Sequence, residues 1–139
     1  MRGGHCIKSW SVTQKHITLS SAEAELMAAV KTSTEVMGIL QLMGEIGVQL
    51  GSEVLVDSSA ALAAVHSKGN GRLRHVRVGH LWIQQVSEDG ELQYQKVDGV
   101  LNPADLMTKS LTAVKIQDFM TKLKQTRRGD RAAEGLALK

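Results

Sequence analysis

Several residue types are scarce in this 139-residue sequence, and each scarcity excludes a class of protein. A single cysteine, Cys6, excludes an internal disulfide and a cysteine-rich zinc site. No run of about 18 apolar residues is present, so the sequence predicts no membrane-spanning helix and no membrane partner. The start, Met1–His5, lacks the apolar stretch of a secretory signal peptide. These absences together predict an intracellular protein, cytoplasmic or nuclear.

Aromatic residues are also few, with two Trp, one Tyr and one Phe, so aliphatic side chains and six Met must fill the core. The hydrophobic content of 42% fits a globular protein, and the length fits one domain with a real core. The net charge of +3 is mild. It tolerates a polyanionic partner such as nucleic acid but does not by itself argue for one.

The sequence around residue 20 predicts the start of a long helix. Ser20 and Glu23 have the spacing of a capping box, in which each side chain reaches the backbone N–H of the other residue. The apolar residues that follow recur at helical spacing and form one stripe: Leu26, Ala29, Val30, Met37 and Leu40. The helix is expected to run to about Ile46, with Gly47 just beyond its end.

A short apolar run, residues 53–56, predicts a strand covered on both faces and paired in parallel. Asp57 follows it, and Ser58 or Ser59 begins a short helix that ends near Val65. Ligands of α/β sheets gather at the carboxyl ends of strands, which makes Asp57 a candidate functional residue. The alternative is that Asp57 caps the next helix.

The remaining elements follow from the same kinds of pattern. We expect strands over 6–12 and 91–97, helices over 73–86 and 113–123, a helix that starts at Asn102, and a charged, disordered tail over 124–139. In the helix at Asn102, Pro103 takes the first position and Asp105 the third.

Three carboxylates could share one chemistry, although each has a structural explanation. Glu25 lies near a helix start, where an acid complements the helix dipole, and Asp105 lies in the first turn of a later helix. If these acids meet Asp57 at one end of the sheet, their oxygens suit magnesium, and paired ions can hydrolyse a phosphodiester. His75 and His80 lack the spacing of a zinc site and are interpreted as packing or surface residues.

Five stretches in this order resemble one known family. They are the strand from Gly4 to Trp10, Ser20–Ala28 (SSAEAELMA), Val54–Ser58 (VLVDS), Arg74–Val78 with Leu81-Trp82-Ile83, and Ala104–Lys109 (ADLMTK). Together they resemble the ribonuclease H domain of copia-type LTR retrotransposon Pol polyproteins, over roughly residues 3–123. The resemblance implies an α/β fold of the ribonuclease H type, a mixed sheet with flanking helices. It also implies that residues 1–123 form this domain and that 124–139 lie outside it.

The resemblance implies a function as well. The complete polyprotein would hydrolyse the RNA strand of RNA–DNA hybrids by a two-metal mechanism with Mg²⁺ or Mn²⁺, next to its reverse transcriptase portion. Glu25, rather than Glu23, together with Asp57 and Asp105 would bind the metal ions and be catalytic. Ser21 and Ser58 would contact the backbone of the hybrid.

The sequence departs from the family pattern at several positions. The family has a first aspartate on an opening strand, and only a few residues precede Cys6 here, so we expect the first one or two strands to be missing. Arg77 stands where the family has Asp, and Leu81 where it has His. The alternative is therefore a catalytically inactive remnant that at most binds nucleic acid weakly, or a chain with no present function.

Overall fold

The computed structural model describes residues 6–12, 18, 20–68, 78–106 and 108–125. These residues form α1 (Ser21–Glu45), β1 (Glu53–Val56), α2 (Ser59–His66), α3 (Val78–Glu88), β2 (Gln93–Lys96), two short 3₁₀ turns at Gly99–Leu101 and Pro103–Asp105, and α4 (Ala113–Lys122). The mixed α/β class predicted from the sequence is confirmed. The chain divides into two compact units, one over residues 14–102 and the other combining residues 1–13 with 103–139.

Helix α1 begins and ends where the sequence predicts. The Ser20 side chain accepts a hydrogen bond from the Glu23 N–H at 3.2 Å, which caps the first turn. At the other end Gly47 has a φ of +79°, a conformation that glycine adopts without a Cβ clash. The Val48 N–H bonds the Met43 carbonyl, and the Gly47 N–H bonds the Gly44 carbonyl. This pair of bonds defines a Schellman motif that stops the helix.

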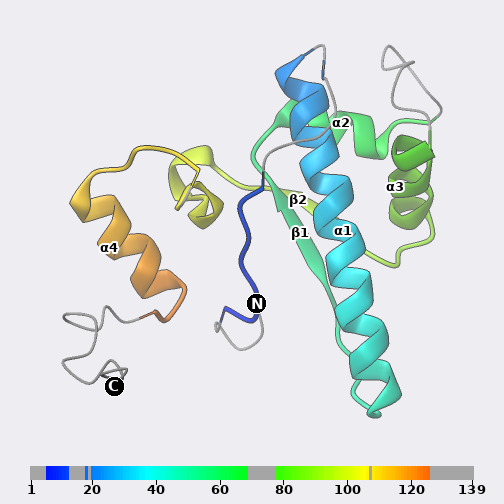
Figure 1. Cartoon of the computed structure of the whole chain (residues 1–139). Coiled ribbons are helices and arrows are strands. Elements are labelled where there is room, and N and C mark those ends of the chain that lie inside the picture. Colours follow the sequence, from blue (N-terminus) through cyan, green and yellow to red (C-terminus); the bar gives the residue numbers. More distant parts are fainter. Residues whose placement is uncertain (1–5, 13–17, 19, 69–77, 107, 126–139) are drawn as a thin grey trace, which may run out of the picture. The chain divides into compact units, whose positions relative to one another are not determined.

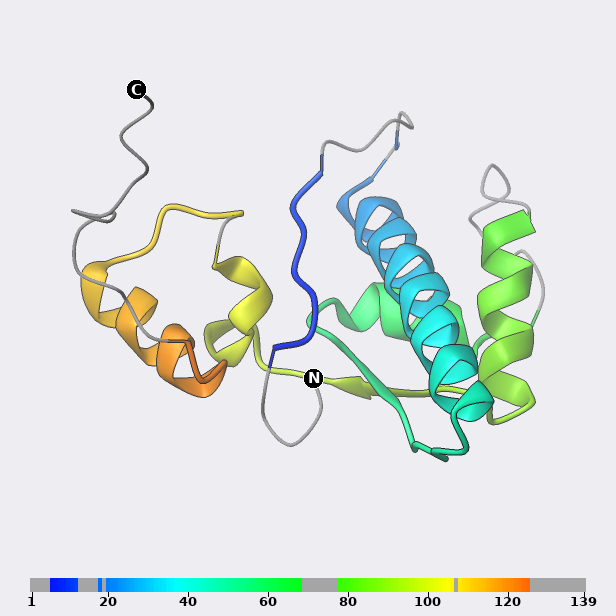
Figure 2. The same cartoon turned by 60° about the horizontal axis from the view of Figure 1, so that its bottom comes forward.

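The described residues of the larger unit form a sheet of two strands. β1 pairs with β2 in parallel, with Glu53 opposite Gln93 and Val56 opposite Lys96. Helices α1, α2 and α3 lie on one face of this sheet (Figures 1 and 2). The core fills the space between helices and strands with fully or nearly fully buried side chains: Leu26, Ala29, Val54, Val56, Ala61, Val65, Ile83, Val86, Leu92 and Tyr94.

One expectation about the sheet is wrong. Parallel pairing is confirmed, but among the described residues of the larger unit the helices cover one face of β1 only. Val54 and Val56 point into the core, whereas Leu55 is 53% exposed. In β2 and the residue before it, exposure alternates, with Leu92 and Tyr94 buried and Gln93 exposed.

Other boundaries differ from the sequence-based expectations. Residues 6–12 form no strand, since a strand needs a hydrogen-bonded neighbour and none of the described residues supplies one. The helix expected at Asn102 is a 3₁₀ turn, Pro103–Asp105. Helix α3 extends to Glu88, and the expected start of that helix, residues 73–77, lies outside the described residues, as do His75 and Arg77. Val78, the first residue of α3, is 82% exposed.

The smaller unit contains α4 and the Pro103–Asp105 turn. Thr112 caps α4, as its hydroxyl accepts from the Lys115 N–H, and the helix ends one residue before the predicted position. Phe119 is buried, whereas Val114 is 79% exposed. Of the predicted tail, residues 126–139 lie outside the described part, and the domain limit at residue 123 stays a prediction.

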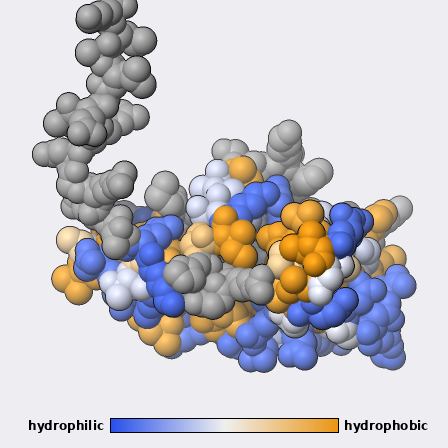
Figure 3. All heavy atoms as spheres, turned by 90° about the horizontal axis from the view of Figure 1, so that it is seen from below, coloured by the Kyte–Doolittle hydropathy of each residue, from blue (hydrophilic) through white to orange (hydrophobic). Residues whose placement is uncertain are grey.

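Hydrophobic side chains also reach the surface. Figure 3 views the molecule from the end at which α1 finishes and shows orange patches among the hydrophilic residues. Leu42 and Ile46, near that end of α1, are 59% and 65% exposed. In the part of the chain that the structure describes, no helix combines the length and the apolar character needed to cross a membrane.

Candidate metal centre

The candidate site lies in the larger unit, at the carboxyl end of the sheet. Because β1 and β2 are parallel, both strands end on the same edge, and α1 starts at this end of the unit (Figure 1). The topology thus places Asp57, which follows β1, at the same end as Glu25, on the second turn of α1. Carboxyl ends of parallel strands are where ligands of α/β sheets bind.

Asp57 is held from two directions. Its side chain is half-buried, and the carboxylate oxygen Oδ2 accepts a hydrogen bond from the Asn102 Nδ2 at 3.2 Å. The Lys96 ammonium, at the end of β2, donates to the main-chain carbonyl of Asp57. Within the described residues the other carboxylate oxygen, Oδ1, has no hydrogen-bond partner. The bond from Asn102 therefore holds Oδ2 in place, and this fixes the direction in which Oδ1 points.

The helix-cap alternative for Asp57 is wrong. Ser58 is the N-cap of α2, since its hydroxyl oxygen accepts from the Ala61 N–H at 3.2 Å. Asp57 thus does not serve the cap and is available for another purpose. The capping role uses the oxygen of Ser58 as acceptor and leaves its hydroxyl proton able to donate to a bound group. Ser21, the first residue of α1, is exposed.

The two glutamates at the start of α1 have opposite environments. Glu23 is only 5% exposed, whereas Glu25 is exposed. A magnesium ion keeps several of its waters, so its protein ligands must be reachable from solvent. Glu25 meets this condition and Glu23 does not.

Asp105 belongs to the other unit, and its meeting with Glu25 and Asp57 stays a prediction. Its carboxylate forms an ion pair with Lys109, at 2.7 Å, four residues further along the chain. The side chain of Asp105 is 14% exposed and that of Lys109 58%. Within either unit, no group of three or more His, Cys, Asp or Glu side chains of described residues is gathered around a common metal position.

The sequence did not indicate two of the groups around Asp57. Asn102 was predicted only as the start of a helix, and Lys96 only as part of a strand. The contact of Asn102 with Asp57 joins residues 45 positions apart, and no local pattern encodes it. The position of Lys96 could have been found, because parallel pairing in register sets the end of β2 beside the end of β1.

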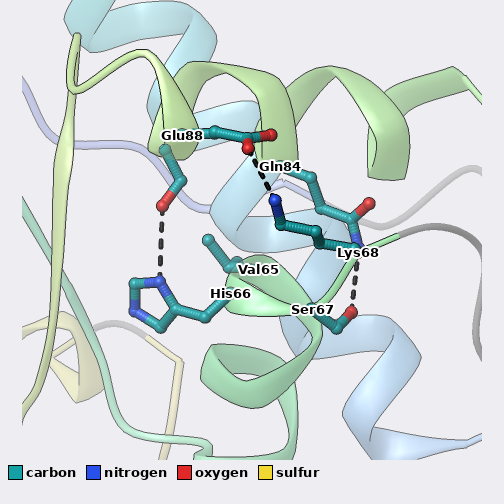
Figure 4. A pocket seen from close by; sticks show the side chains of 7 residues that line it. Val65, His66, Ser67, Lys68, Gln84 and Glu88 are labelled. Carbon is teal, nitrogen blue, oxygen red and sulfur yellow. Dashed lines mark hydrogen bonds and ion pairs between the residues drawn. The ribbon is translucent and has the colours of Figure 1, made fainter.

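A separate pocket of about 190 Å³ lies at the opposite end of α2. Figure 4 shows its polar lining, in which Lys68 pairs with Glu88 at 2.9 Å and His66 Nδ1 lies 3.4 Å from the Ser87 hydroxyl. Both members of the ion pair are highly exposed, so their attraction is screened by water. Next to this pocket, His80 is 1% exposed and its Nε2 lies 3.2 Å from the Ala64 carbonyl, which agrees with its interpretation as a packing residue.

Known proteins similar to this chain are transposon polyproteins. One is the retrovirus-related Pol polyprotein from transposon TNT 1-94 of Nicotiana tabacum, which is 35% identical over 104 residues, 73% of this chain and 8% of that protein. Another is the retrovirus-related Pol polyprotein from transposon RE2 of Arabidopsis thaliana, 30% identical over 86% of this chain and 8% of that protein. The corresponding RE1 polyprotein is 29% identical over 89% of this chain and 9% of that protein.

These similarities relate the chain to a segment of retrotransposon Pol polyproteins of the copia type. The chain spans less than a tenth of the length of these relatives. No protein-family model and no solved structure matches it.

Proposed function

We propose that this chain is part of the ribonuclease H segment of a retrotransposon Pol polyprotein, which hydrolyses the RNA strand of RNA–DNA hybrids with Mg²⁺ or Mn²⁺. The observation that carries the proposal is the position of Asp57. It follows β1 directly, serves no helix cap and presents an oriented carboxylate at the sheet end where α1 starts. The similarity to Pol polyproteins supports the same conclusion independently.

The donor groups fit a hard divalent cation. Magnesium is commonly bound through one or two carboxylates plus water and substrate phosphate oxygens. Asp57 supplies Oδ1, and Glu25 supplies an exposed carboxylate on the neighbouring helix. Asp105 would be a third ligand, which requires its carboxylate to exchange Lys109 for a metal ion. When bound, paired ions activate the attacking water and stabilise the leaving oxygen.

The hydroxyls of Ser21 and Ser58 would contact the hybrid. Both residues begin helices, Ser21 as the first residue of α1 and Ser58 as the cap of α2. Backbone N–H groups at helix starts favour phosphate, and hydroxyl groups can bond phosphate or the RNA 2′-hydroxyl. In the proposed polyprotein the reverse transcriptase portion would deliver the hybrid to this site.

The test is Mg²⁺-dependent cleavage of a labelled RNA–DNA hybrid. We would compare residues 1–139 alone with the same chain fused to the segment that precedes the matching region in the tobacco relative. We expect the fusion to cut the RNA strand and Asp57→Asn to abolish cutting. Glu53→Gln is a matched control, since it removes the same charge from an exposed position on β1 and should cut normally.

The alternative is a catalytically inactive remnant that at most binds nucleic acid weakly. Two-metal hydrolysis needs several carboxylates around its ions, so the two hypotheses differ in whether the fusion cuts the hybrid. If the fusion binds the hybrid but does not cut it, this alternative is correct. Cutting by the unextended chain that survives Asp57→Asn would contradict the carboxylate mechanism itself.

A further inference from the structure

The loop after β2 reaches back to the candidate metal centre. Within it, Gly99–Leu101 form a 3₁₀ turn capped by Asp98, whose carboxylate accepts from the Val100 N–H. This turn brings Asn102 alongside Asp57, a residue from the end of the neighbouring strand. The contact therefore depends on the turn geometry as well as on the sheet.

The orientation of the Asn102 side chain is fixed by chemistry. An ionised carboxylate only accepts hydrogen bonds, so the amide must turn its NH₂ group, and not its oxygen, toward Asp57. The bond is 3.2 Å long and partly buried, and it engages Oδ2 alone. It thereby restricts rotation of the carboxylate and leaves Oδ1 to face a ligand.

We propose that Asn102 is a positioning residue that holds the Asp57 carboxylate in the metal-binding orientation. This inference rests on the proposed function, because it assigns Asn102 a role at the same site. Asn102 does not itself need to touch the metal ion or the hybrid. A residue that orients a metal ligand commonly contributes about 10- to 100-fold to metal affinity, since the ligand otherwise has to be ordered during binding.

The hydrogen bond from Lys96 to the main chain of Asp57 can be compared with the bond from Asn102 to its side chain. Lys96 bonds the main-chain carbonyl of the same aspartate, so Lys96→Gln disturbs the neighbourhood of Asp57 without touching its carboxylate. Asn102→Ala removes the bond to the carboxylate itself. A positioning role predicts that these two variants differ, whereas a general loosening of the loop predicts that they behave alike.

The experiment uses residues 1–139 and Mn²⁺ as the probe. Mn²⁺ broadens nearby amide signals in NMR spectra, so a titration reports both where the ion binds and how tightly. In the unaltered chain we expect broadening first at Asp57 and Ser58. Asn102→Ala should weaken this binding by about tenfold, Lys96→Gln should not weaken it, and Asn102→Gln should restore part of the affinity. The melting temperature of each variant shows whether the fold is retained.

The outcomes separate the two proposals. If Mn²⁺ binds at Asp57 with the same affinity in Asn102→Ala, the positioning role is wrong and the metal centre stands. Equal weakening by Asn102→Ala and Lys96→Gln also contradicts the positioning role. If the unaltered chain shows no broadening at Asp57, the metal centre fails and the role of Asn102 fails with it.

Discussion

The buried hydrogen bond between Ser33 and Tyr94 makes the most quantitative prediction about the fold. It links α1 to β2 across the core, with an oxygen–oxygen distance of 2.9 Å. Ser33 also lies 2.8 Å from the Ala29 carbonyl, to which its single proton is donated. The Tyr94 hydroxyl must therefore be the donor in the bond between the two side chains. Ser33 is 0% and Tyr94 6% exposed, so water cannot replace either partner.

The two single substitutions should lower the free energy of unfolding by different amounts. Tyr94→Phe removes one bond and leaves the Ser33 proton satisfied by Ala29, which should lower the free energy of unfolding by about 0.5–1.5 kcal/mol. Ser33→Ala leaves the buried Tyr94 hydroxyl without an acceptor and should cost about 1–3 kcal/mol. In the double variant neither group is stranded, so its cost should be smaller than the sum of the two.

Urea denaturation of the three variants and the unaltered chain measures these differences. Each kcal/mol corresponds to a melting-temperature shift of about 4–8 °C in a small domain. Equal urea dependence of the unfolding free energy in all four proteins would show that the comparison is valid. Strictly additive costs, or a smaller cost for Ser33→Ala than for Tyr94→Phe, would refute the buried bond.

Three further predictions concern pH, packing and charge. Burial raises the pKa of Tyr94 above its ordinary value of 10.0. The folded state then holds this proton more tightly, so the unfolding free energy should be unaffected by Tyr94 below about pH 10 and fall as the pH rises above it. Tyr94→Phe should lack this loss in an alkaline denaturation series. Leu26→Ala should cost about 2–5 kcal/mol, since Leu26 is fully buried. Leu42→Ala in the same helix, at 59% exposure, should change stability by less than about 0.5 kcal/mol; similar midpoints in urea would contradict the described core. Lys96→Gln removes a positive charge beside Asp57 and should tighten Mn²⁺ binding about two- to threefold at low salt. Isothermal titration calorimetry measures this affinity. An unchanged affinity would show that Lys96 does not lie beside the metal centre.

Local patterns predicted the parts of the fold that local interactions determine. The Ser20 cap and Gly47 set both ends of α1, and the sequence contains both signals. The end of β1, the position of Asp57 and the helix that follows were also predictable, because an apolar run, an acid and a capping serine are adjacent in the chain.

Other features depend on partners that are distant in the sequence. Leu55 has the same apolar character as its neighbours, and its exposure follows from the packing of all three helices on one face. Residues 6–12 alternate like a strand, but pairing needs a neighbouring strand. Asn102 resembles a helix cap, and its contact with Asp57 arises only once β2 has paired with β1.

We propose that Glu25, Asp57 and Asp105 hold divalent cations at one site. Crystals of residues 1–139 soaked in MnCl₂ test it directly, because the anomalous scattering of manganese locates each ion. We expect a peak about 2.1 Å from Asp57 Oδ1, the distance expected for a small hard cation. Carboxylate oxygens of Glu25 and Asp105 should lie around the same peak. Manganese bound elsewhere, with Asp57 unliganded or Asp105 remote from Glu25, would contradict the proposed metal centre.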